Sequence, residues 1–569
     1  MESSISLGIE ETYNQRTDFL VLALTGRTGS GCTTAAGTLS KHFKDISINT
    51  TGLATQENRK LAIVSRFCEA QWKPFKVITI STLIFSFLLS KDSSEVHAFL
   101  DKIRVSDANK IIVILNNLKS SEHYEEFNRC IVEGRRDSES RAWIFYEDSL
   151  KNSIAEVRQI LENKYTSVFQ TLGNNIRMSG DALSSDEIPD QLFTLIRRVK
   201  RLTKAAFTHE KENGEDSVRV VIDAVRNPLE LVYLRDQFAA FYAVALTCDD
   251  SDRIERLQEN GLSKKEVKAI DEKEYSEKKK HLDSYESFVS QNIQDCIQKS
   301  DIFLANSGKL VEYVQNIRIL NTQIVRYVSL MLRPGLVTPT GDERCMQLAF
   351  VAKLNSGCIS RQVGAALADQ HRSVKSVGWN DVPKGQVPCL LRDVDELLTG
   401  GDVDAFSTFE KTDQKFITQI KQTFLNRGSV KAIGLPCPYC FKREYNKSIK
   451  TENQVHTRSL HAEENAFLQL TKHGGAGIEG GFLYTTASPC ELCSKKAFQL
   501  GIREIVYVDP YPGISSSHIL SSGDHAARPN VRLFNGAIGH AYHRLYEPIL
   551  PIKDEYLARL ASDPQRPLI

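Results

Sequence analysis

The residues of this chain best suited to metal chemistry gather in its final third. His461 and Glu463 belong to the segment His-Ala-Glu, and Cys490 and Cys493 belong to the segment Pro-Cys-Glu-Leu-Cys. Zinc prefers histidine nitrogen and cysteine thiolate, and catalytic zinc sites use three protein ligands and leave a fourth position open for water. His461, Cys490 and Cys493 supply three such ligands. Both segments stand at the start of a predicted helix, where the helix dipole favours ionised thiolates.

Glu463 stands two residues after His461, near the metal without being required as a ligand. Bound zinc lowers the pKa of its water from 15.7 to about 7. A carboxylate beside such a water can take its proton, deliver it to a ring nitrogen and pass another to a departing amine. This order of histidine, glutamate and paired cysteines is the signature of zinc nucleobase deaminases, so Glu463 is the predicted catalytic residue. The alternative is a closed zinc knuckle in which Glu463 is only a charge on a helix face.

Several segments of the chain resemble the deoxycytidylate deaminases, over about residues 344–545. The similar stretches are CISRQVGAAL from Cys358, SVGWNDVPKG around Asn380, HAEENA from His461 and SPCELC ending at Cys493. The resemblance implies an α/β/α domain of the cytidine deaminase type and a bound Zn²⁺. It also implies deoxycytidine nucleotides as substrates and assembly into a homo-oligomer.

The same resemblance implies roles for residues around the metal. Asn380 would contact the sugar, and the backbone of Ala462 and Ser488 would read the edge of the pyrimidine. Tyr511, in the segment VYVDPYPG, would lie against the base or the sugar. Tryptophan and aspartate flank Asn380 where the family usually has tyrosine and glycine, so the resemblance does not fix the exact shape of the pocket.

Additional cysteines predict a second, structural Zn²⁺ site. Cys358 and Cys389 stand where some phage-type relatives carry ligands for a further zinc, and Cys437-Pro-Tyr-Cys440 has the spacing of a zinc knuckle. Four cysteines would close a tetrahedral site, and His456 competes for a place in it. The alternative is that these residues are reduced thiols that hold no metal.

A glycine-rich loop, TGRTGSGCTT, begins at Thr25, after the apolar run FLVLAL, and opens a predicted helix. This is the setting of a phosphate-binding loop. Cys32 stands where such loops carry lysine, so the group that stabilises a transferring phosphoryl is missing. The segment VRVVIDAVRNPLE resembles the acidic strand of P-loop nucleotide kinases, with Asp223 in the place of an acid that associates with Mg²⁺. The predicted nucleotide-binding residues are Gly26, Gly29, Gly31, Thr33, Thr34 and Asp223.

Three interpretations of this N-terminal half stay open. In the first, it binds a regulatory nucleotide triphosphate, with or without Mg²⁺, as a sensor and catalyses no reaction. In the second, it is a structural or partner-binding relic. In the third, it is an active kinase that uses a lysine from another position. Arg226, Arg253 and Arg256 are candidate phosphate contacts or ordinary surface arginines.

The combination of a P-loop-kinase-like half with a deaminase-like half resembles bacterial anti-phage deoxycytidylate deaminases, also called antiviral cytidine deaminases. The resemblance implies conversion of dCTP and dCMP to uracil nucleotides, depletion of deoxycytidine nucleotides during phage infection and, in some members, inhibition by a small RNA. Two alternatives stay open. One is a polynucleotide-editing deaminase, although the near-zero net charge of the chain argues against it. The other is a nucleotide- or RNA-sensing regulator with a vestigial deaminase centre.

The composition is that of an ordinary globular protein. Of 569 residues, 41% are hydrophobic and 25% are charged, which excludes disordered and fibrous classes. The net charge of +1 argues against a chain-wide surface for nucleic acid or anionic lipid. The first residues do not resemble a signal peptide, and the most apolar stretch, 77–89, is too short to span a bilayer. We therefore expect a cytoplasmic protein with no membrane segment, whose twelve cysteines are reduced.

The elements that position these motifs follow from the alternation of apolar runs. In the first half the predicted strands, separated by amphipathic stretches as in a parallel α/β sheet, are 19–24, 76–80, 110–115, 142–147, 218–225 and 243–248. A second α/β set follows, with helices at 344–354, 459–473 and 490–500 and strands at 363–368, 373–379, 481–486, 504–508 and 531–534.

The predicted fold class is therefore α/β in both halves. We predict a P-loop-kinase-like domain over residues 1–310 and a helical linker over 311–340. A deaminase domain is predicted over 341–569, with a cysteine-bearing insertion at 387–455.

Overall fold

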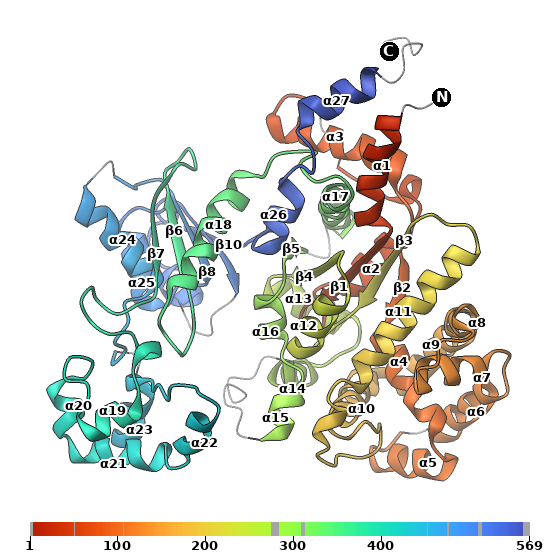
Figure 1. The fold of residues 1–569 in the computed structure, drawn as a ribbon, viewed down its shortest axis with the longest axis horizontal. Coiled ribbons are helices and arrows are strands. Elements are labelled where there is room, and N and C mark those ends of the chain that lie inside the picture. The colour runs from red at the N-terminus through yellow and green to blue at the C-terminus, as the bar shows by residue number, and fades with distance from the viewer. Residues whose placement is uncertain are drawn as a thin grey trace. The chain divides into compact units, whose positions relative to one another are not determined.

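The chain forms two compact units, one made of Met1–Thr338 with His540–Ile569 and one made of Pro339–Gly539 (Figure 1). The structure is a computed structural model, and it describes residues 4–49, 52–105, 107–274, 284–308, 313–451, 453, 455–474, 477–509 and 515–561. Both units are mixed α/β, which confirms the predicted class. None of the helices in these ranges is long and apolar enough to cross a membrane.

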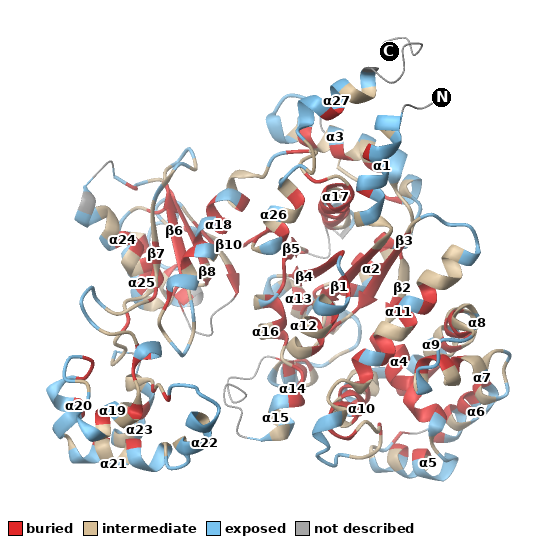
Figure 2. Cartoon of the chain, viewed as in Figure 1, coloured by how far each residue is buried: buried red, intermediate tan, exposed pale blue. Residues whose placement is uncertain are grey.

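The first unit is built on parallel strands in the order β5-β4-β1-β3-β2. Their bounds are β1 (Phe19–Thr25), β2 (Lys76–Thr79), β3 (Val218–Asp223), β4 (Phe241–Thr247) and β5 (Ile302–Ala305). The side chains of β3 and β4 are buried throughout, as expected for a parallel sheet with helices on both faces (Figure 2). Parallel pairing brings the carboxyl ends of β1 and β3 to one edge, where the glycine-rich loop begins.

The helices of this unit connect and cover those strands. They are α1 (Ser4–Thr17), α2 (Cys32–Leu39), α3 (Gln56–Gln71), α4 (Ile80–Ser86), α5 (Ser93–Lys102), α6 (Ala108–Lys119), α7 (Tyr124–Phe127), α8 (Glu139–Ile144), α9 (Lys151–Leu161), α10 (Tyr165–Ser179), α11 (Thr194–Glu212), α12 (Pro228–Gln237), α13 (Asp250–Glu259), α14 (Lys264–Glu274), α15 (Tyr285–Val289), α16 (Ile293–Gln298), α17 (Tyr313–Leu332), α26 (His540–Tyr546) and α27 (Ile552–Ala561).

Two predicted strands are helical, so those predictions are wrong. Residues 110–115 lie in α6, and 142–147 span the end of α8 and a further helical turn over Phe145–Leu150. The apolar run of α6 continues beyond 115, and its buried residues Ile111, Ile114, Leu115 and Leu118 have helical spacing. A short apolar run alone does not distinguish a strand from a buried helix.

The packing also differs from the predicted domain boundaries. Helix α17, which falls in the predicted linker 311–340, packs on α2 and α3 and contributes to the core of the first unit. Asn321 on this helix accepts a hydrogen bond from Thr38 at 2.9 Å. The last segment, predicted within the deaminase domain, instead joins the first unit, because α27 packs on α1 and its Glu555 pairs with Arg333.

The second unit contains a mixed sheet in the order β10-β9-β8-β6-β7. Strands β8, β9 and β10 are parallel, whereas β6 is antiparallel to both β7 and β8. The bounds are β6 (Gly364–Ala368), β7 (Val374–Trp379), β8 (Phe482–Ala487), β9 (Glu504–Asp509) and β10 (Asn530–Leu533); the two-residue β11 (Gly536–Ala537) is not part of this sheet. All five predicted strands of this unit are confirmed, with ends shifted by a residue or two.

Helices pack on this sheet and form the insertion. They are α18 (Gly341–Ala352), α19 (Val394–Thr399), α20 (Thr408–Thr412), α21 (Gln414–Thr423), α22 (Arg427–Ala432), α23 (Phe441–Ile449), α24 (Ala462–His473) and α25 (Glu491–Gln499). Along β6, Gly364 meets α18 while Ala365 and Leu367 pack with α24, so these two helices lie on opposite faces. Residues of α19, α21 and α23 and of the loops beside them form a small core of their own.

Candidate metal centre and phosphate-binding loop

Two helix N-termini carry the predicted metal ligands. His461 is the residue that precedes the first turn of α24, Cys490 holds the same position before α25, and Cys493 lies one turn further along α25. The Nδ1 atom of His461 lies 3.2 Å from the Cys490 sulfur and 3.5 Å from the Cys493 sulfur. All three ligand atoms lie within 4.8 Å of one another, so the structure brings the three residues together.

The chemistry and spacing of this donor set fit zinc. A tetrahedral ion with Zn–S bonds of about 2.3 Å and a Zn–N bond of about 2.0 Å would separate nitrogen from sulfur by roughly 3.5 Å. The two nitrogen–sulfur distances match that value closely. A hydrogen bond from Cys493, together with the neighbouring His461 ring, lowers the pKa of the Cys490 thiol to about 4, so this sulfur is a thiolate and a ready ligand.

Glu463 lies in the first turn of α24 and is only 4% exposed. Burial raises the pKa of its carboxyl group, while the His461 ring opposes that shift, so the two residues are electrostatic neighbours. The hydroxyl of Thr485 on β8 lies 3.4 Å from Oε1 of Glu463 and 2.8 Å from the Ala487 carbonyl oxygen. Sequence reasoning missed Thr485, because a threonine inside a strand carries no motif of its own.

The predicted substrate contacts occupy the strand ends around this centre. Asn380 directly follows β7; its Oδ1 accepts the Val363 N–H at 2.7 Å and its Nδ2 donates to the Arg361 carbonyl at 2.7 Å. Its side chain therefore also stabilises the turn before β6 through these two hydrogen bonds. The Ser488 N–H donates to the Asp509 carbonyl at 2.9 Å, which ties Ser488 to the end of β9.

The two remaining predicted substrate contacts are Ala462, which the structure describes, and Tyr511, which it does not. Ala462 is the first residue of α24, and a first-turn amide has no acceptor within its own helix. Tyr511 lies outside the described residues. Arg361, which the sequence analysis did not single out, forms an ion pair with the buried carboxylate of Asp509. That pair links the turn before β6 to the end of β9.

The five residues predicted to hold a second metal do not form a comparable ligand group. Among the residues that the structure describes, only the cluster of His461, Cys490 and Cys493 brings three such ligand atoms together. Each of the other candidates has a partner: Cys440 accepts from Ser360, Cys389 lies near Arg458, the Cys437 amide donates to Asp393, the Cys358 amide donates to Ser356, and the His456 ring packs on Tyr445. Cys389 and Cys440 are also electrostatic neighbours, since Cys440 contributes to the raised pKa of Cys389.

The glycine-rich loop runs from the end of β1 to the start of α2. Gly31 has a φ of 107°, and a Cβ there would lie 2.2 Å from the side-chain nitrogen of Asn306, so any other residue would strain the backbone and displace Asn306. The Thr33 hydroxyl in the first turn of α2 donates to the Asp223 carboxylate, at the end of β3, at 2.9 Å. Burial raises the pKa of Cys32 to about 12, so the position of the missing lysine holds a neutral thiol.

The remaining residues of the predicted phosphate site occupy the same loop. Gly26 and Gly29 lie between β1 and α2, and Thr34 follows Thr33 in α2. Of the three candidate arginines, Arg226 hydrogen-bonds to Thr28 of the loop at 3.1 Å. Arg253 also reaches the loop, through the Thr28 carbonyl. Arg256 donates instead to the carbonyls of Asn306 and Gly308.

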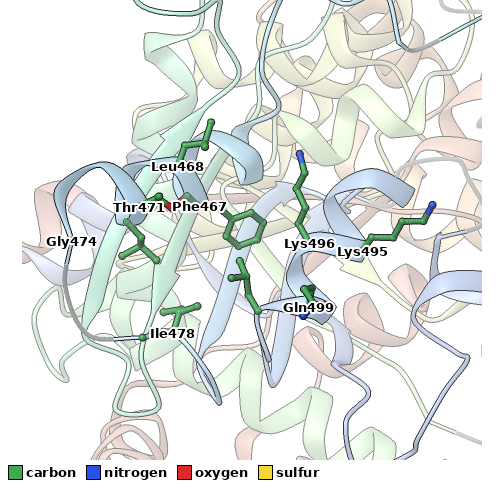
Figure 3. A pocket seen from close by; sticks show the side chains of 11 residues that line it. Phe467, Leu468, Thr471, Gly474, Ile478, Lys495, Lys496 and Gln499 are labelled. Atoms are coloured by element: carbon green, nitrogen blue, oxygen red, sulfur yellow. The ribbon is translucent and has the colours of Figure 1, made fainter.

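A hollow of about 690 Å³ lies on the surface formed by α24 and α25, away from these ligands. Figure 3 shows Phe467 and Leu468 at one side and Lys495 and Lys496 at the other. The predicted site residues do not line it. It therefore contributes nothing to the proposed metal centre.

Comparisons with known proteins point to one family. The family model described as the cytidine and deoxycytidylate deaminase zinc-binding region matches residues 339–509, within the second unit. The deoxycytidylate deaminase of Enterobacteria phage T4 is 30% identical over 166 residues, which cover 29% of this chain and 76% of the phage protein. The phage T2 enzyme is 27% identical over 168 residues, covering 29% of this chain and 78% of that protein.

Two further similarities are to a yeast protein and to a solved structure. The deoxycytidylate deaminase of Schizosaccharomyces pombe is 27% identical over 182 residues, which cover 32% of this chain and 41% of the yeast protein. A crystal structure of the dCMP deaminase from cyanophage S-TIM5 in apo form has 21% sequence identity and a TM-score of 0.20. It covers 35% of this chain and 100% of the cyanophage chain.

Proposed function

Because the chain belongs, through residues 339–509, to the deoxycytidylate deaminase family, we propose that it hydrolyses the exocyclic amine of a deoxycytidine nucleotide. Water replaces the amine at C4 of the cytosine, and the products are a uracil deoxynucleotide and ammonia. The observation that carries the proposal is the buried carboxylate of Glu463 beside the clustered ligand atoms of His461, Cys490 and Cys493.

The metal expected at this cluster is Zn²⁺, which the matched family binds. His461, Cys490 and Cys493 would hold it. When bound, it lowers the pKa of a coordinated water to about 7. Because both cysteines stand at the N-terminus of α25, the amides and dipole of that helix stabilise their thiolates.

Glu463 is the residue that moves protons in this proposal. Its carboxylate takes a proton from the attacking water and delivers it to N3 of the ring as the C4–O bond forms. A second proton, from the new C4 hydroxyl, passes through the same carboxylate to the amine, which leaves as ammonia when the C4–N bond breaks. Thr485 lies at the Oε1 atom of this carboxylate and helps to hold it in place.

The base is oriented by groups at the strand ends and at the helix start. The Ala462 N–H donates to the pyrimidine carbonyl oxygen, and the Ser488 carbonyl accepts from the exocyclic amine. Asn380 contacts the sugar with the donor and acceptor capacity that its two backbone hydrogen bonds leave over. These contacts select cytosine over a base that lacks the exocyclic amine.

A substrate panel tests the proposal. The purified full chain is offered dCMP, dCTP, CMP, deoxycytidine and a cytosine-containing oligonucleotide, and ammonia and products are measured. We expect dUMP or dUTP to form, and Glu463→Gln to lower the rate by about 10²–10⁴-fold with its zinc retained. Glu479→Gln is the matched control, because Glu479 is an exposed carboxylate of the same unit and is not one of the clustered ligands.

Other results would redirect the proposal. Activity on the oligonucleotide alone would make the protein a polynucleotide-editing deaminase. Full activity of Glu463→Gln would remove the proposed proton carrier. No activity in a zinc-loaded chain would favour the regulator with a vestigial centre.

We extend the proposal to both dCMP and dCTP as substrates and to control by the first unit, through a triphosphate with Mg²⁺ at the glycine-rich loop or through an RNA. The Thr33–Asp223 hydrogen bond supports the Mg²⁺ assignment, because a hydroxyl and an acid of this kind flank the metal in phosphate-binding loops.

The proposed biological role is defence against phage, because removal of dCTP would deprive a replicating phage of a DNA precursor. Nucleotide pools in infected cells that express the chain or its Glu463→Gln variant test this role.

A further inference from the structure

A buried carboxylate from a distant helix lies in the glycine-rich loop. Glu274, the last residue of α14, is 1% exposed. Its Oε2 accepts the Thr28 backbone N–H at 2.9 Å, and its Oε1 accepts from the Thr28 hydroxyl. The Arg226 guanidinium completes the set by donating to the same Oε1 atom. One carboxylate therefore receives an amide, a hydroxyl and a guanidinium at the mouth of the loop.

These three donors are the kinds of group that hold phosphate oxygens in proteins. Backbone amides of glycine-rich loops bind phosphates, and arginine is favoured where anionic oxygens are recognised. A carboxylate offers the same negatively charged acceptors in a smaller group. Glu274 thus occupies a position whose partners are suited to a phosphoryl group.

We propose that Glu274 is an internal occupant of an anion site in the glycine-rich loop, and that a phosphoryl group of a nucleotide or polyphosphate binds there by displacing it. This inference rests on the phosphate-binding role proposed for the loop and identifies what fills the loop in its unliganded state. It is independent of the deaminase chemistry. The displaced carboxylate passes into water, and the incoming phosphate takes its place on Thr28 and Arg226.

The surrounding charges support an exchange of this kind. Arg27 pairs with Asp250 and Asp271, and Arg253 also pairs with both of these acids. Together with the Arg226–Glu274 pair, three arginines face three acids around the loop. Withdrawal of Glu274 leaves the other five residues, three arginines and two aspartates, with one positive charge in excess, which attracts a phosphate.

The pairs made by Asp271 also explain how the occupant is held. Asp271 lies three residues before Glu274 on α14, so both acids face the loop side of that helix. Arg253 binds Asp271 and donates to the Thr28 carbonyl at 3.2 Å, which ties α14 to the loop a second time. Glu272, between the two acids, is exposed and takes no part.

Calorimetric titration of the full chain with inorganic tripolyphosphate, and then with ATP and dCTP, tests the inference. Removal of an internal competitor raises the fraction of loop that is free to bind, so Glu274→Gln is expected to lower the Kd about tenfold or more. Glu272→Gln removes the same charge from the exposed face of α14 and is expected to leave the Kd unchanged. Arg226→Gln added to Glu274→Gln is expected to abolish the gain.

The outcomes separate the two levels of the proposal. Equal Kd values for the wild-type chain and Glu274→Gln would overturn the internal occupant while leaving the loop a phosphate site. No binding by any folded variant, with folding checked by thermal unfolding, would overturn the phosphate role and the inference together. If Glu274→Gln does not fold, Glu274→Asp, which keeps the charge and withdraws it by one methylene, must bind tripolyphosphate more tightly than wild type, or the inference fails.

Discussion

The metal centre of the second unit and the glycine-rich loop of the first are both built where strands end and helices begin. At the metal centre the motif residues themselves converge: His461, Cys490 and Cys493 come within 4.8 Å of one another. At the loop the donors are already engaged by Glu274, which is 246 positions from Thr28 in the chain. One site is formed by three ligands that converge, and the other already holds an anion that the chain itself supplies.

This difference bears on what each site does. A site whose ligands converge on their own needs only its metal to become competent. A site that is filled by the chain responds to the concentration of a ligand, because the ligand must displace the occupant before it binds. We therefore assign constant chemistry to the metal centre and a switchable role to the loop.

The largest effect is expected when the metal centre is broken. Cys490→Ser removes one of three ligands, and we expect zinc to be lost and ammonia release to fall to background. Metal analysis and the ammonia assay measure both changes. Cys345→Ser is the control, because Cys345 is buried in the same unit, contacts the Arg372 carbonyl oxygen and is not one of the clustered ligands. Full zinc content in Cys490→Ser would remove Cys490 from the site.

A smaller effect is expected from the packing that positions the metal ligand. Gly378 on β7 lies under α24, and a Cβ there would lie 2.3 Å from the Ala462 carbonyl oxygen. Gly378→Ala should therefore cost about 1–3 kcal/mol of unfolding free energy by overpacking and lower the deamination rate. Chemical denaturation measures the first change.

The matched control is Gly428→Ala on α22. Gly428 has open space around it and lies in a helix, where alanine is favoured over glycine by about 1 kcal/mol. That variant is expected to keep or gain stability with unchanged activity. If both variants behaved alike, the close approach of α24 to β7 would not position the site.

The smallest effect is expected at the loop. Burial raises the pKa of Asp223, and the Thr33 hydroxyl opposes that shift. Thr33→Val removes this donor from the carboxylate and should cost about 1–2 kcal/mol near neutral pH. The cost should shrink as the pH falls and Asp223 becomes protonated in the folded chain. Thr33→Ser keeps the hydroxyl and should cost little; a loss in Thr33→Val that does not change with pH would contradict this account.

Sequence reasoning was most informative where ligands are close along the chain. His461 and Glu463, like Cys490 and Cys493, are held in register by a single helix start, so spacing alone predicts which of them share a site. Their roles as ligands and proton carrier stay predictions. The three helices and five strands predicted for the second unit likewise lie within a few residues of the observed α18, α24, α25 and β6–β10, because each predicted segment has a regular apolar pattern.

What sequence reasoning missed depends on contacts between distant elements. Glu274 and Thr485 carry no motif, and only the packing of α14 on the loop and of β8 beside α24 gives them partners. The run at 110–115 was misassigned because its apolar residues suit a strand as well as a buried helix. The place of the last helix, α27, is set by tertiary pairs such as Arg333–Glu555, which no local pattern reveals.

The central claim is that this chain replaces the amine of a deoxycytidine nucleotide with oxygen from water. The most direct test is to run the reaction with dCMP and with dCTP in water enriched in heavy oxygen, H₂¹⁸O, and to weigh the products by mass spectrometry. The account predicts uracil deoxynucleotide that carries one heavy oxygen in the base, together with free ammonia. It is contradicted if the zinc-loaded chain returns both substrates unchanged, or if the uracil product carries only light oxygen.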